Sequence, residues 1–339
     1  MLPDGTSPTL GELVNATDRV NLLQIRPAAT PALIADIGGS TSRFALAIGG
    51  ERPQQIVTIA NDSVGSIAAA IEQYLDQIET RPVTAVLAIA GPLDGDEIRL
   101  TNRAWCIRLS DLRERFGFAH VRAINDFEAV GWALLGLAPS DIRPLGSACE
   151  ERRGAKVVLG PGTGLGVAAL VPVREGWHVV ASEGGHMSFG PAADDEEPVF
   201  ARLRAERGSV SAEAILSGPG LIRLHAALHP GATRLTSEDI IARAKDGDSA
   251  ARATTTLFTR LLGRFAGDVA VTFKAIAGVY VTGGVAVGLD PILDESVFRA
   301  AFEAHPPYQA MLATTPTCLL TCAQPGLIGC AALVDQLID

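Results

Sequence analysis

A strand, a glycine-rich turn and a second strand occur twice in this chain of 339 residues. The first copy covers residues 33–48, with the turn GGSTS, and the second covers residues 157–171, with the turn PGTGLG. Glycine backbone in a tight hairpin presents N–H groups that can bind an anion. Two such hairpins in the two halves of one chain therefore predict duplicated lobes, each holding one end of a triphosphate across a cleft.

Strands and helices alternate along the rest of the chain. Apolar residues at helical spacing mark residues 64–78, and short apolar runs at 83–90 and 121–124 predict buried strands. The Ala-rich stretch 248–277 is the longest predicted helix, and residues 325–338 predict another at the end of the chain. This alternation indicates an α/β protein with parallel strands.

Composition and charge exclude several classes of protein. Apolar residues make up 47% and charged residues 19% of the chain, which is enough aliphatic material for a large core. The net charge of −10, without a block of Lys or Arg, argues against nucleic acid or an anionic membrane as partner. The cysteines are odd in number and form no C-x-x-C pair, so they predict reduced thiols in a cytoplasmic protein. They are Cys106, Cys149, Cys318, Cys322 and Cys330.

The first hairpin carries a cluster of polar groups around its glycines. Hydroxyl groups beside the turn add donors for an anion, and Asp36 before the turn can hold Mg²⁺ through water. No Gly-Lys-Ser/Thr sequence follows and the G-x-G-x-x-G spacing is absent, so this is neither a P-loop nor a dinucleotide fingerprint. The alternative is an ordinary hairpin that needs glycine for its turn. The cluster comprises Asp36, Gly38, Gly39, Ser40, Thr41 and Arg43.

The second hairpin contains glycines at spacings like those of a dinucleotide-binding loop. An apolar strand follows it instead of a helix, so the dinucleotide interpretation fails on context. Taken together with the first hairpin, it predicts a second contact with phosphate. Its residues are Gly160, Gly162, Thr163, Gly164 and Gly166.

Polar side chains elsewhere are candidates for the reacting centre. Asn125 and Asp126 follow a short strand, where Asp126 could accept the proton of a substrate hydroxyl, or could simply cap the next helix. Glu183 and His186, separated by two glycines, could face one small polar ligand, although a lone histidine is more often a core residue. Glu213 is placed at a helix start, where the helix dipole favours an acid in any case. The acidic run 194–197 is expected to be a solvated loop.

These segments occur in an order that resembles the bacterial glucokinase family, the hexokinase-like sugar kinases of the actin-like ATPase superfamily. The match runs from Leu33 to the C-terminus, and any single stretch is weak, whereas seven in register are a strong signal. The matching stretches are ADIGGSTSRFAL, AIAGPLDGDEIRLTNRAW, INDFEAVGWAL, LGPGTGLGVAAL, SEGGHMSFGP, VSAEAILSGPGL and VYVTGG.

The resemblance implies an α/β, two-lobed actin-like ATPase fold of the ribonuclease H-like type. Its duplicated lobes, with a mixed sheet and flanking helices, surround a central cleft. We expect residues 1–30 to form an N-terminal extension, residues 31–136 the small lobe and residues 137–322 the large lobe. We also expect a C-terminal helix at 323–339 that packs back on the small lobe.

The resemblance also implies an activity, namely ATP-dependent phosphorylation of the 6-hydroxyl of glucose with Asp126 as general base. The substrates and cofactors are then glucose, ATP and Mg²⁺, with no direct metal ligand assigned, and the protein is expected to be a cytoplasmic homodimer. The implied sugar ligands are Asn125, Asp126, Glu183, His186 and Glu213. The implied nucleotide contacts are Asp36, Gly38, Gly39, Ser40, Thr41, Arg43, Gly162, Thr163, Gly164, Gly218, Gly220, Gly283 and Gly284.

The sequence departs from the family pattern in two places. Ser40-Thr41 stands where the family usually has Thr-Asn, and the stretch FKAIAG before VYVTGG is less typical, which affects the expected adenine pocket. Alternative functions are a kinase for another hexose or an amino sugar and a non-catalytic sugar-sensing regulator. Kinases of the repressor/open-reading-frame/kinase (ROK) group carry a cysteine-rich zinc motif, whereas no cysteine lies between Cys149 and Cys318 here.

Overall fold

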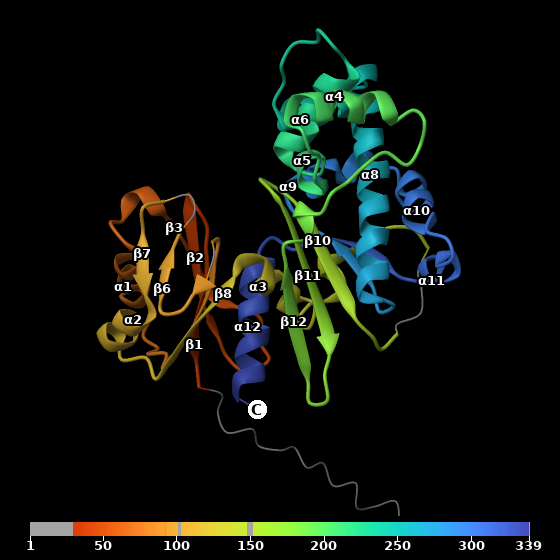
Figure 1. Cartoon of the computed structure of the whole chain (residues 1–339). Coiled ribbons are helices and arrows are strands. Elements are labelled where there is room, and N and C mark those ends of the chain that lie inside the picture. Colours follow the sequence, from red (N-terminus) through yellow and green to blue (C-terminus); the bar gives the residue numbers. More distant parts are fainter. Residues whose placement is uncertain (1–29, 92, 101–102, 148–151, 339) are drawn as a thin grey trace, which may run out of the picture.

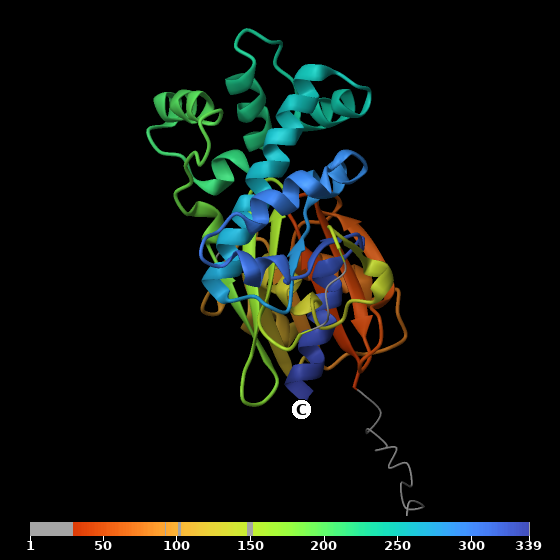
Figure 2. The same ribbon diagram turned by 90° about the vertical axis from the view of Figure 1, so that its right-hand side faces the viewer.

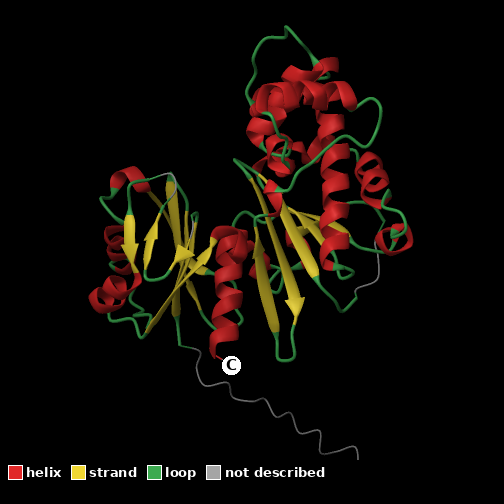
Figure 3. Ribbon diagram, in the orientation of Figure 1, coloured by secondary structure: helices red, strands yellow, loops and turns green. Residues whose placement is uncertain are grey.

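The computed structural model describes residues 30–91, 93–100, 103–147 and 152–338. The expected N-terminal extension, apart from Thr30, and Cys149 lie outside these residues. Two large sheets stand side by side with a long helix between them, and Figures 1 and 3 show this arrangement. The predicted alternation of strands and helices is confirmed.

The first sheet contains the first glycine hairpin and has five strands in the order β3-β2-β1-β4-β8. Strand β1 pairs antiparallel with β2 and parallel with β4, which in turn pairs parallel with β8. The strands are β1 (Ala32–Ile37), β2 (Thr41–Ala47), β3 (Gln54–Ala60), β4 (Thr84–Ile89) and β8 (His120–Asn125). A three-stranded sheet lies in the same half of the chain and is formed by β5 (Leu93–Asp94), β6 (Glu97–Arg99) and β7 (Cys106–Arg108).

The second large sheet repeats the pairing of the first. Its order is β12-β11-β10-β13-β14-β9, and β10 pairs antiparallel with β11 and parallel with β13, as β1 does with β2 and β4. The strands are β9 (Ile142–Pro144), β10 (Lys156–Pro161), β11 (Leu165–Pro172), β12 (Trp177–Ser182), β13 (Val279–Val281) and β14 (Thr317–Leu320). The expected duplication is therefore visible in the strand topology.

Helices cover both sheets, and those between residues 197 and 245 lie beyond the end of the six-stranded sheet, as Figure 2 shows from the side. In the first half they are α1 (Ile67–Leu75), α2 (Leu109–Phe116) and α3 (Asp126–Ala133). In the second half they are α4 (Glu197–Arg207), α5 (Ala212–Ile215), α6 (Gly218–Leu228), α7 (Ser237–Lys245), α8 (Ser249–Phe273), α9 (Gly284–Leu289), α10 (Glu295–Glu303), α11 (Gln309–Ala313) and α12 (Pro325–Ile338).

Helices α3 and α12 join the two sheets. Helix α12 contacts α3, β1 and β4, and α3 contacts β11 and β12 of the other sheet. A Cβ on Gly329 of α12 would lie 1.7 Å from the carbonyl oxygen of Ala129 in α3, so the helix backbones touch there. One buried cluster extends from Ile34 through Leu327 to Val158, and this shared core holds the sheets on either side of the helix pair.

The acidic run 194–197 differs from the expected solvated loop at Glu196. This side chain is 2% exposed and accepts hydrogen bonds from Arg264 at 2.7 Å and from the backbone N–H of Ala192 at 2.9 Å. Arg260 lies 3.2 Å from its other oxygen. A buried carboxylate needs paired charges and donors, and α8 supplies two guanidinium groups from one side. The prediction was therefore wrong for Glu196.

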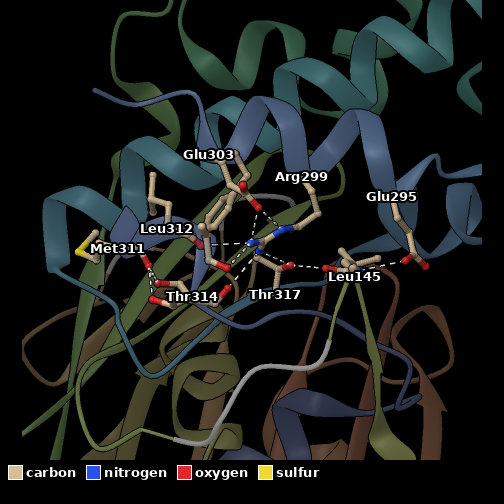
Figure 4. Close-up of polar contacts among 12 residues, drawn as sticks. Leu145, Glu295, Arg299, Glu303, Met311, Leu312, Thr314 and Thr317 are labelled. Carbon is tan, nitrogen blue, oxygen red and sulfur yellow. Dashed lines mark hydrogen bonds and ion pairs between the residues drawn. The ribbon is translucent and has the colours of Figure 1, made fainter. Parts of the chain in front are cut away.

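Arg299 connects the C-terminal helices to the edge of the six-stranded sheet (Figure 4). Its guanidinium binds Glu303, one turn further along α10, at 2.6 Å. The same group donates to the carbonyl oxygens of Leu312 and Thr315 at 3.1 Å and 3.0 Å and to the Thr317 hydroxyl at 3.0 Å. The planar fork of arginine suits such a set of acceptors, which fixes α10 and α11 against β14.

Candidate active site

A cavity of about 390 Å³ opens where the end of β8, the second glycine turn and the residues after β12 converge. It gathers residues that the sequence predicted separately for the sugar, the phosphate and the proton transfer. Its lining comprises Asn125, Asp126, Phe127, Gly160, Gly162, Thr163, Gly164, Leu165, Gly166, Ser182, Glu183, Glu213 and Gly283. Asn125, Ser182 and Glu183 also line a neighbouring cavity of about 500 Å³.

Asp126 begins α3, and Asn125 is the N-cap of that helix. The Asn125 side-chain oxygen accepts hydrogen bonds from the N–H groups of Phe127 at 2.8 Å and Glu128 at 3.3 Å. The capping role considered for this pair therefore belongs to Asn125, which satisfies the first donors of the helix. Asp126 lies one residue further on, with its carboxylate on the wall of the cavity.

The surroundings of Asp126 raise the pKa of its carboxyl above the ordinary value. Burial raises the pKa of this carboxyl, and the nearby charge of Glu183 raises it further. Hydrogen bonds from backbone N–H groups and from Asn125 oppose this shift, with Phe127 the nearest backbone partner at 2.9 Å. A raised pKa makes the carboxylate a stronger base, which suits a group that must accept a proton.

Glu183, His186 and Glu213 come together from two segments of the chain. The imidazole of His186 lies 3.8 Å from the Glu183 carboxylate and 4.0 Å from that of Glu213. The His186 side chain is 60% exposed, so it is not the core histidine considered as the alternative. A Cβ on Gly185 would lie 2.1 Å from the Leu165 carbonyl oxygen, so glycine there lets this segment pack against the second turn.

The second glycine turn is fixed by hydrogen bonds from two directions. Within the turn, the N–H of Gly162 donates to the Gly164 carbonyl at 2.8 Å. The Gly162 carbonyl accepts from the N–H of Gly218 at the start of α6, also at 2.8 Å. The N–H of Leu165 donates to Glu213 at 2.9 Å, so a predicted sugar ligand holds the predicted phosphate turn.

Two glycines predicted with this turn pack against an aromatic ring. A Cβ on Gly160 would lie 2.8 Å from the ring of Phe127, and one on Gly166 would lie 2.2 Å from it. Glycine at both positions therefore makes room for Phe127, which follows Asp126 and would be displaced by larger residues. Gly162 and Gly164 remain as the glycines of the turn itself.

The remaining predicted nucleotide glycines have different surroundings. Gly283 has a φ of +90°, and its Cβ would lie 2.5 Å from the Pro161 carbonyl oxygen on the wall of the cavity. Gly284 follows it at the start of α9, with open space around the position of a Cβ. Gly220 is not among the residues that line the cavity, and its Cβ would meet the carbonyl oxygen of Ile215 in α5 at 2.2 Å. Packing of α6 on α5 accounts for glycine at this position.

In the first hairpin, the Asp36 side chain lies beside Arg43 and close enough to Asp126 to interact with its charge. The Arg43 guanidinium lies 3.6 Å from the Asp36 carboxylate, whose side chain is 25% exposed. Burial raises the pKa of Asp36, Arg43 lowers it, and the charge of Asp126 raises it again. Gly38, Gly39 and Ser40 form the turn between β1 and β2, and Thr41 is the first residue of β2. None of these residues lines the 390 Å³ cavity.

The family model for glucokinase matches residues 33–337 of the chain. The chain belongs to the glucokinase family. A glucokinase from Agrobacterium fabrum is 40% identical over 308 residues, covering 89% of this chain and 91% of that protein. A glucokinase from Chelativorans sp. is 39% identical over 309 residues, covering 89% and 90%.

Among solved structures, a glucokinase from an Antarctic psychrotroph shares the glucokinase fold seen here. It is 31% identical, with a TM-score of 0.86, and the match covers 91% of this chain and 99% of that one. The predicted fold class is confirmed, since these sugar kinases have the actin-like ATPase fold and both halves of this chain show its repeated strand order.

Sequence reasoning missed two residues that hold the first turn of this glucokinase-family chain, Asn61 and Arg103. Asn61 follows β3 directly, and its amide donates to the Gly38 carbonyl oxygen at 2.8 Å. Arg103 donates to the Gly39 carbonyl at 3.0 Å. Arg103 lies within a stretch that matches the family pattern, but nothing in its sequence position indicates a contact with the turn.

Within residues 30–91, 93–100, 103–147 and 152–338, no three His, Cys, Asp or Glu side chains gather into a group that could hold a metal ion. None of the helices in those ranges is both long and apolar enough to span a bilayer.

Proposed function

We propose that this chain is a glucokinase, which transfers the terminal phosphoryl group of ATP to the 6-hydroxyl of glucose. The observation that carries the proposal is the position of Asp126. It shares one cavity with the second glycine turn, Glu183 and Glu213, so a base, phosphate donors and sugar ligands converge. The names of the relatives that are 39–40% identical support the same reaction.

In the proposed mechanism, Asp126 accepts the proton of the sugar 6-hydroxyl as the oxygen attacks phosphorus. Phosphoryl transfer has a loose transition state, so most of the rate enhancement comes from positioning and charge stabilisation. Asn125, Glu183, His186 and Glu213 bind the sugar hydroxyls. The turns at Gly38–Thr41 and Gly162–Gly164 bind the two ends of the triphosphate through backbone N–H groups other than those of Gly38 and Gly162, which bond within their turns.

Mg²⁺ fits the proposed site next to Asp36. This carboxylate has Arg43 as its ion-pair partner and a raised pKa due to burial and Asp126, so a cation nearby would relieve the clustering of acids. Mg²⁺ prefers oxygen ligands and keeps several waters, which agrees with a single carboxylate acting through water. When bound with ATP, the ion would neutralise part of the negative charge of the phosphates.

The remaining expectations belong to the same proposal. We infer a small lobe of residues 31–136 and a large lobe of 137–322, with the helix at 323–339 packed on the small lobe. Contacts of α12 with β1 and β4 support this division. We also propose a cytoplasmic homodimer that takes glucose, ATP and Mg²⁺ and has neither nucleic acid nor a membrane as partner.

A coupled kinase assay tests the function. Purified protein is given ATP and Mg²⁺ with glucose, mannose, fructose, glucosamine or N-acetylglucosamine, and ADP formation is followed. Glucose is expected to give the highest kcat/KM. Faster turnover of another sugar would reassign the substrate, and sugar binding without ADP formation would point to a sugar-sensing regulator. Polyphosphate and ADP in place of ATP test the phosphate donor, with formation of glucose 6-phosphate followed instead, because neither donor yields ADP.

A further inference from the structure

The carbonyl groups of the first glycine turn, from Gly38 to Thr41, all accept hydrogen bonds. Asn61 provides three of these contacts. Its side-chain amide donates to the carbonyls of Gly38 at 2.8 Å and Gly39 at 3.2 Å, and its own N–H donates to the Ser40 carbonyl at 2.9 Å. The Thr41 carbonyl accepts from the N–H of Gly38 at 3.0 Å, which closes the turn.

Asn61 is itself held in a single orientation. The residue is fully buried, with 0% exposure, and its side-chain oxygen accepts a hydrogen bond from the Ser42 hydroxyl at 2.7 Å. Because that oxygen faces a donor, the amide nitrogen must face the turn carbonyls. A buried amide with partners at both ends fixes the atoms around it, since leaving either end unpaired is costly.

Arg103 adds a charged donor to the same turn. Its guanidinium donates to the Gly39 carbonyl at 3.0 Å and to the Asn61 carbonyl at 3.3 Å, and it pairs with Asp62. The side chain is 21% exposed and lies over the ring of Trp105, 4.9 Å from its centre. Arg103, which lies between β6 and β7 of the three-stranded sheet, therefore places a positive charge at the carbonyl side of the turn.

The N–H groups of Gly39 and Ser40 remain available for a ligand, whereas that of Gly38 bonds within the turn. None of the hydrogen bonds found among the described residues uses the N–H of Gly39 or Ser40. Carbonyl oxygens repel phosphate, whereas backbone N–H groups attract it. Because the turn carbonyls are held by donors, the free N–H groups of Gly39 and Ser40 are the backbone groups that the turn offers to phosphate.

We propose that Asn61 and Arg103 are positioning residues for ATP, which clamp the carbonyls of the first turn so that the N–H groups of Gly39 and Ser40 bind phosphate. The inference rests on the proposed function for the identity of the nucleotide. Neither residue touches the sugar ligands, so the clamp affects ATP and leaves glucose binding unchanged.

The test is isothermal titration of the full chain with ATP and Mg²⁺, and separately with glucose, for four proteins. They are the unmodified chain, Arg103→Ala, Arg103→Lys and the control Arg108→Ala. Arg108 lies at the end of β7 and is 59% exposed, with an ion pair to Glu97, so its removal takes away one positive charge without touching the turn. Asn61→Asp, which replaces the amide donor with an oxygen, is a further variant.

Arg103→Ala is expected to weaken ATP binding about tenfold, as befits the loss of a charge-assisted hydrogen bond. Arg103→Lys should give an intermediate value, because one ammonium cannot span the three acceptors. Asn61→Asp should weaken ATP binding at least as much as Arg103→Ala. For both Arg103 variants, glucose affinity and melting temperature should stay at the values of the unmodified chain. Arg108→Ala should match the unmodified chain in ATP affinity, glucose affinity and melting temperature.

Two results would overturn the clamp. One is ATP affinity of Arg103→Ala within twofold of the unmodified chain. The other is a parallel loss of ATP and glucose binding with a lower melting temperature, which is the behaviour of a merely structural residue. The proposed function is tested separately: it is wrong if the unmodified chain binds ATP but does not phosphorylate glucose. In that case the ATP titrations still decide whether Asn61 and Arg103 position the first turn.

Discussion

The carboxylate of Glu213 accepts a hydrogen bond from the backbone N–H of Leu165 at 2.9 Å. The two residues lie on α5 and at the start of β11, and a Cβ on the neighbouring Gly164 would lie 2.6 Å from the same carboxylate oxygen. Glu213 thus contacts the second glycine turn through one carboxylate oxygen, and its other oxygen lies 4.0 Å from the His186 imidazole. The contact couples the proposed sugar site to the proposed phosphate site without any intervening side chain.

Replacement of Asp126 by Asn is expected to abolish most phosphoryl transfer while leaving glucose affinity largely intact. Asn keeps the shape of the side chain but cannot accept a proton, and loss of a general base typically costs about 10²–10⁴ in rate. Steady-state kcat and a glucose titration on the same preparation measure both effects. A variant that keeps more than about half of kcat would exclude Asp126 as the base.

The acid limb of the pH profile should lie above the ordinary pKa of an aspartate. Asp126 acts only when deprotonated, so kcat/KM falls as pH falls through its raised pKa. Glu183→Gln removes a charge that raises this pKa, so the limb should move to lower pH even though the height of the profile drops. The control is Glu197→Gln, at an exposed position in α4. A limb that stays in place or moves upward contradicts the assignment.

His186→Ala should raise the KM for glucose by up to about tenfold and leave the KM for ATP unchanged. The substitution removes one hydrogen-bonding group from the proposed sugar site and touches neither glycine turn. Because the side chain is 60% exposed, the melting temperature should stay constant. N-acetylglucosamine should be a poor substrate, since its acetyl group crowds this position. Normal folding with an unchanged glucose KM would remove His186 from the sugar site.

Glucose is expected to draw the two sheets together. Asn125 is the last residue of β8 in the five-stranded sheet, whereas Glu183 follows β12 of the six-stranded sheet, so a sugar that binds both residues favours a closed state. Small-angle X-ray scattering should show a smaller radius of gyration at saturating glucose, with galactose as a comparison sugar. An unchanged radius at saturation would mean that the cleft is already closed.

Gly329→Ala should destabilise the protein by about 1–3 kcal/mol or more, because the new Cβ cannot fit where α12 touches α3. That atom would lie 1.7 Å from the Ala129 carbonyl oxygen, so the helices must separate. Gly65→Ala is the matched control, since no atom lies within 4 Å of its Cβ position. Urea unfolding of the two variants measures the difference. Equal urea midpoints for the two variants would show that α3 and α12 can move apart at little cost in stability.

Much of the fold could be predicted because the signals are local. The strand–turn–strand units and the helices at residues 64–78 and 325–338 depend on neighbours a few residues apart. The structure places α1 at Ile67–Leu75 and α12 at Pro325–Ile338. The family resemblance then supplied the order in which these units pack.

Contacts between distant parts of the chain were decided by the tertiary structure alone. Asn61 meets Gly38, and Arg103 meets Gly39, only because β3 and the three-stranded sheet fold back onto the first turn. Likewise, Glu196 resembles a surface acid in sequence, and only the packing of α8 beside it gives it two arginine partners. The sequence by itself determined which residues are candidates for the chemistry, because their types and local spacing are written in it. Only the folded chain decided which of them hold others in place, because that depends on distances between segments that no local pattern encodes.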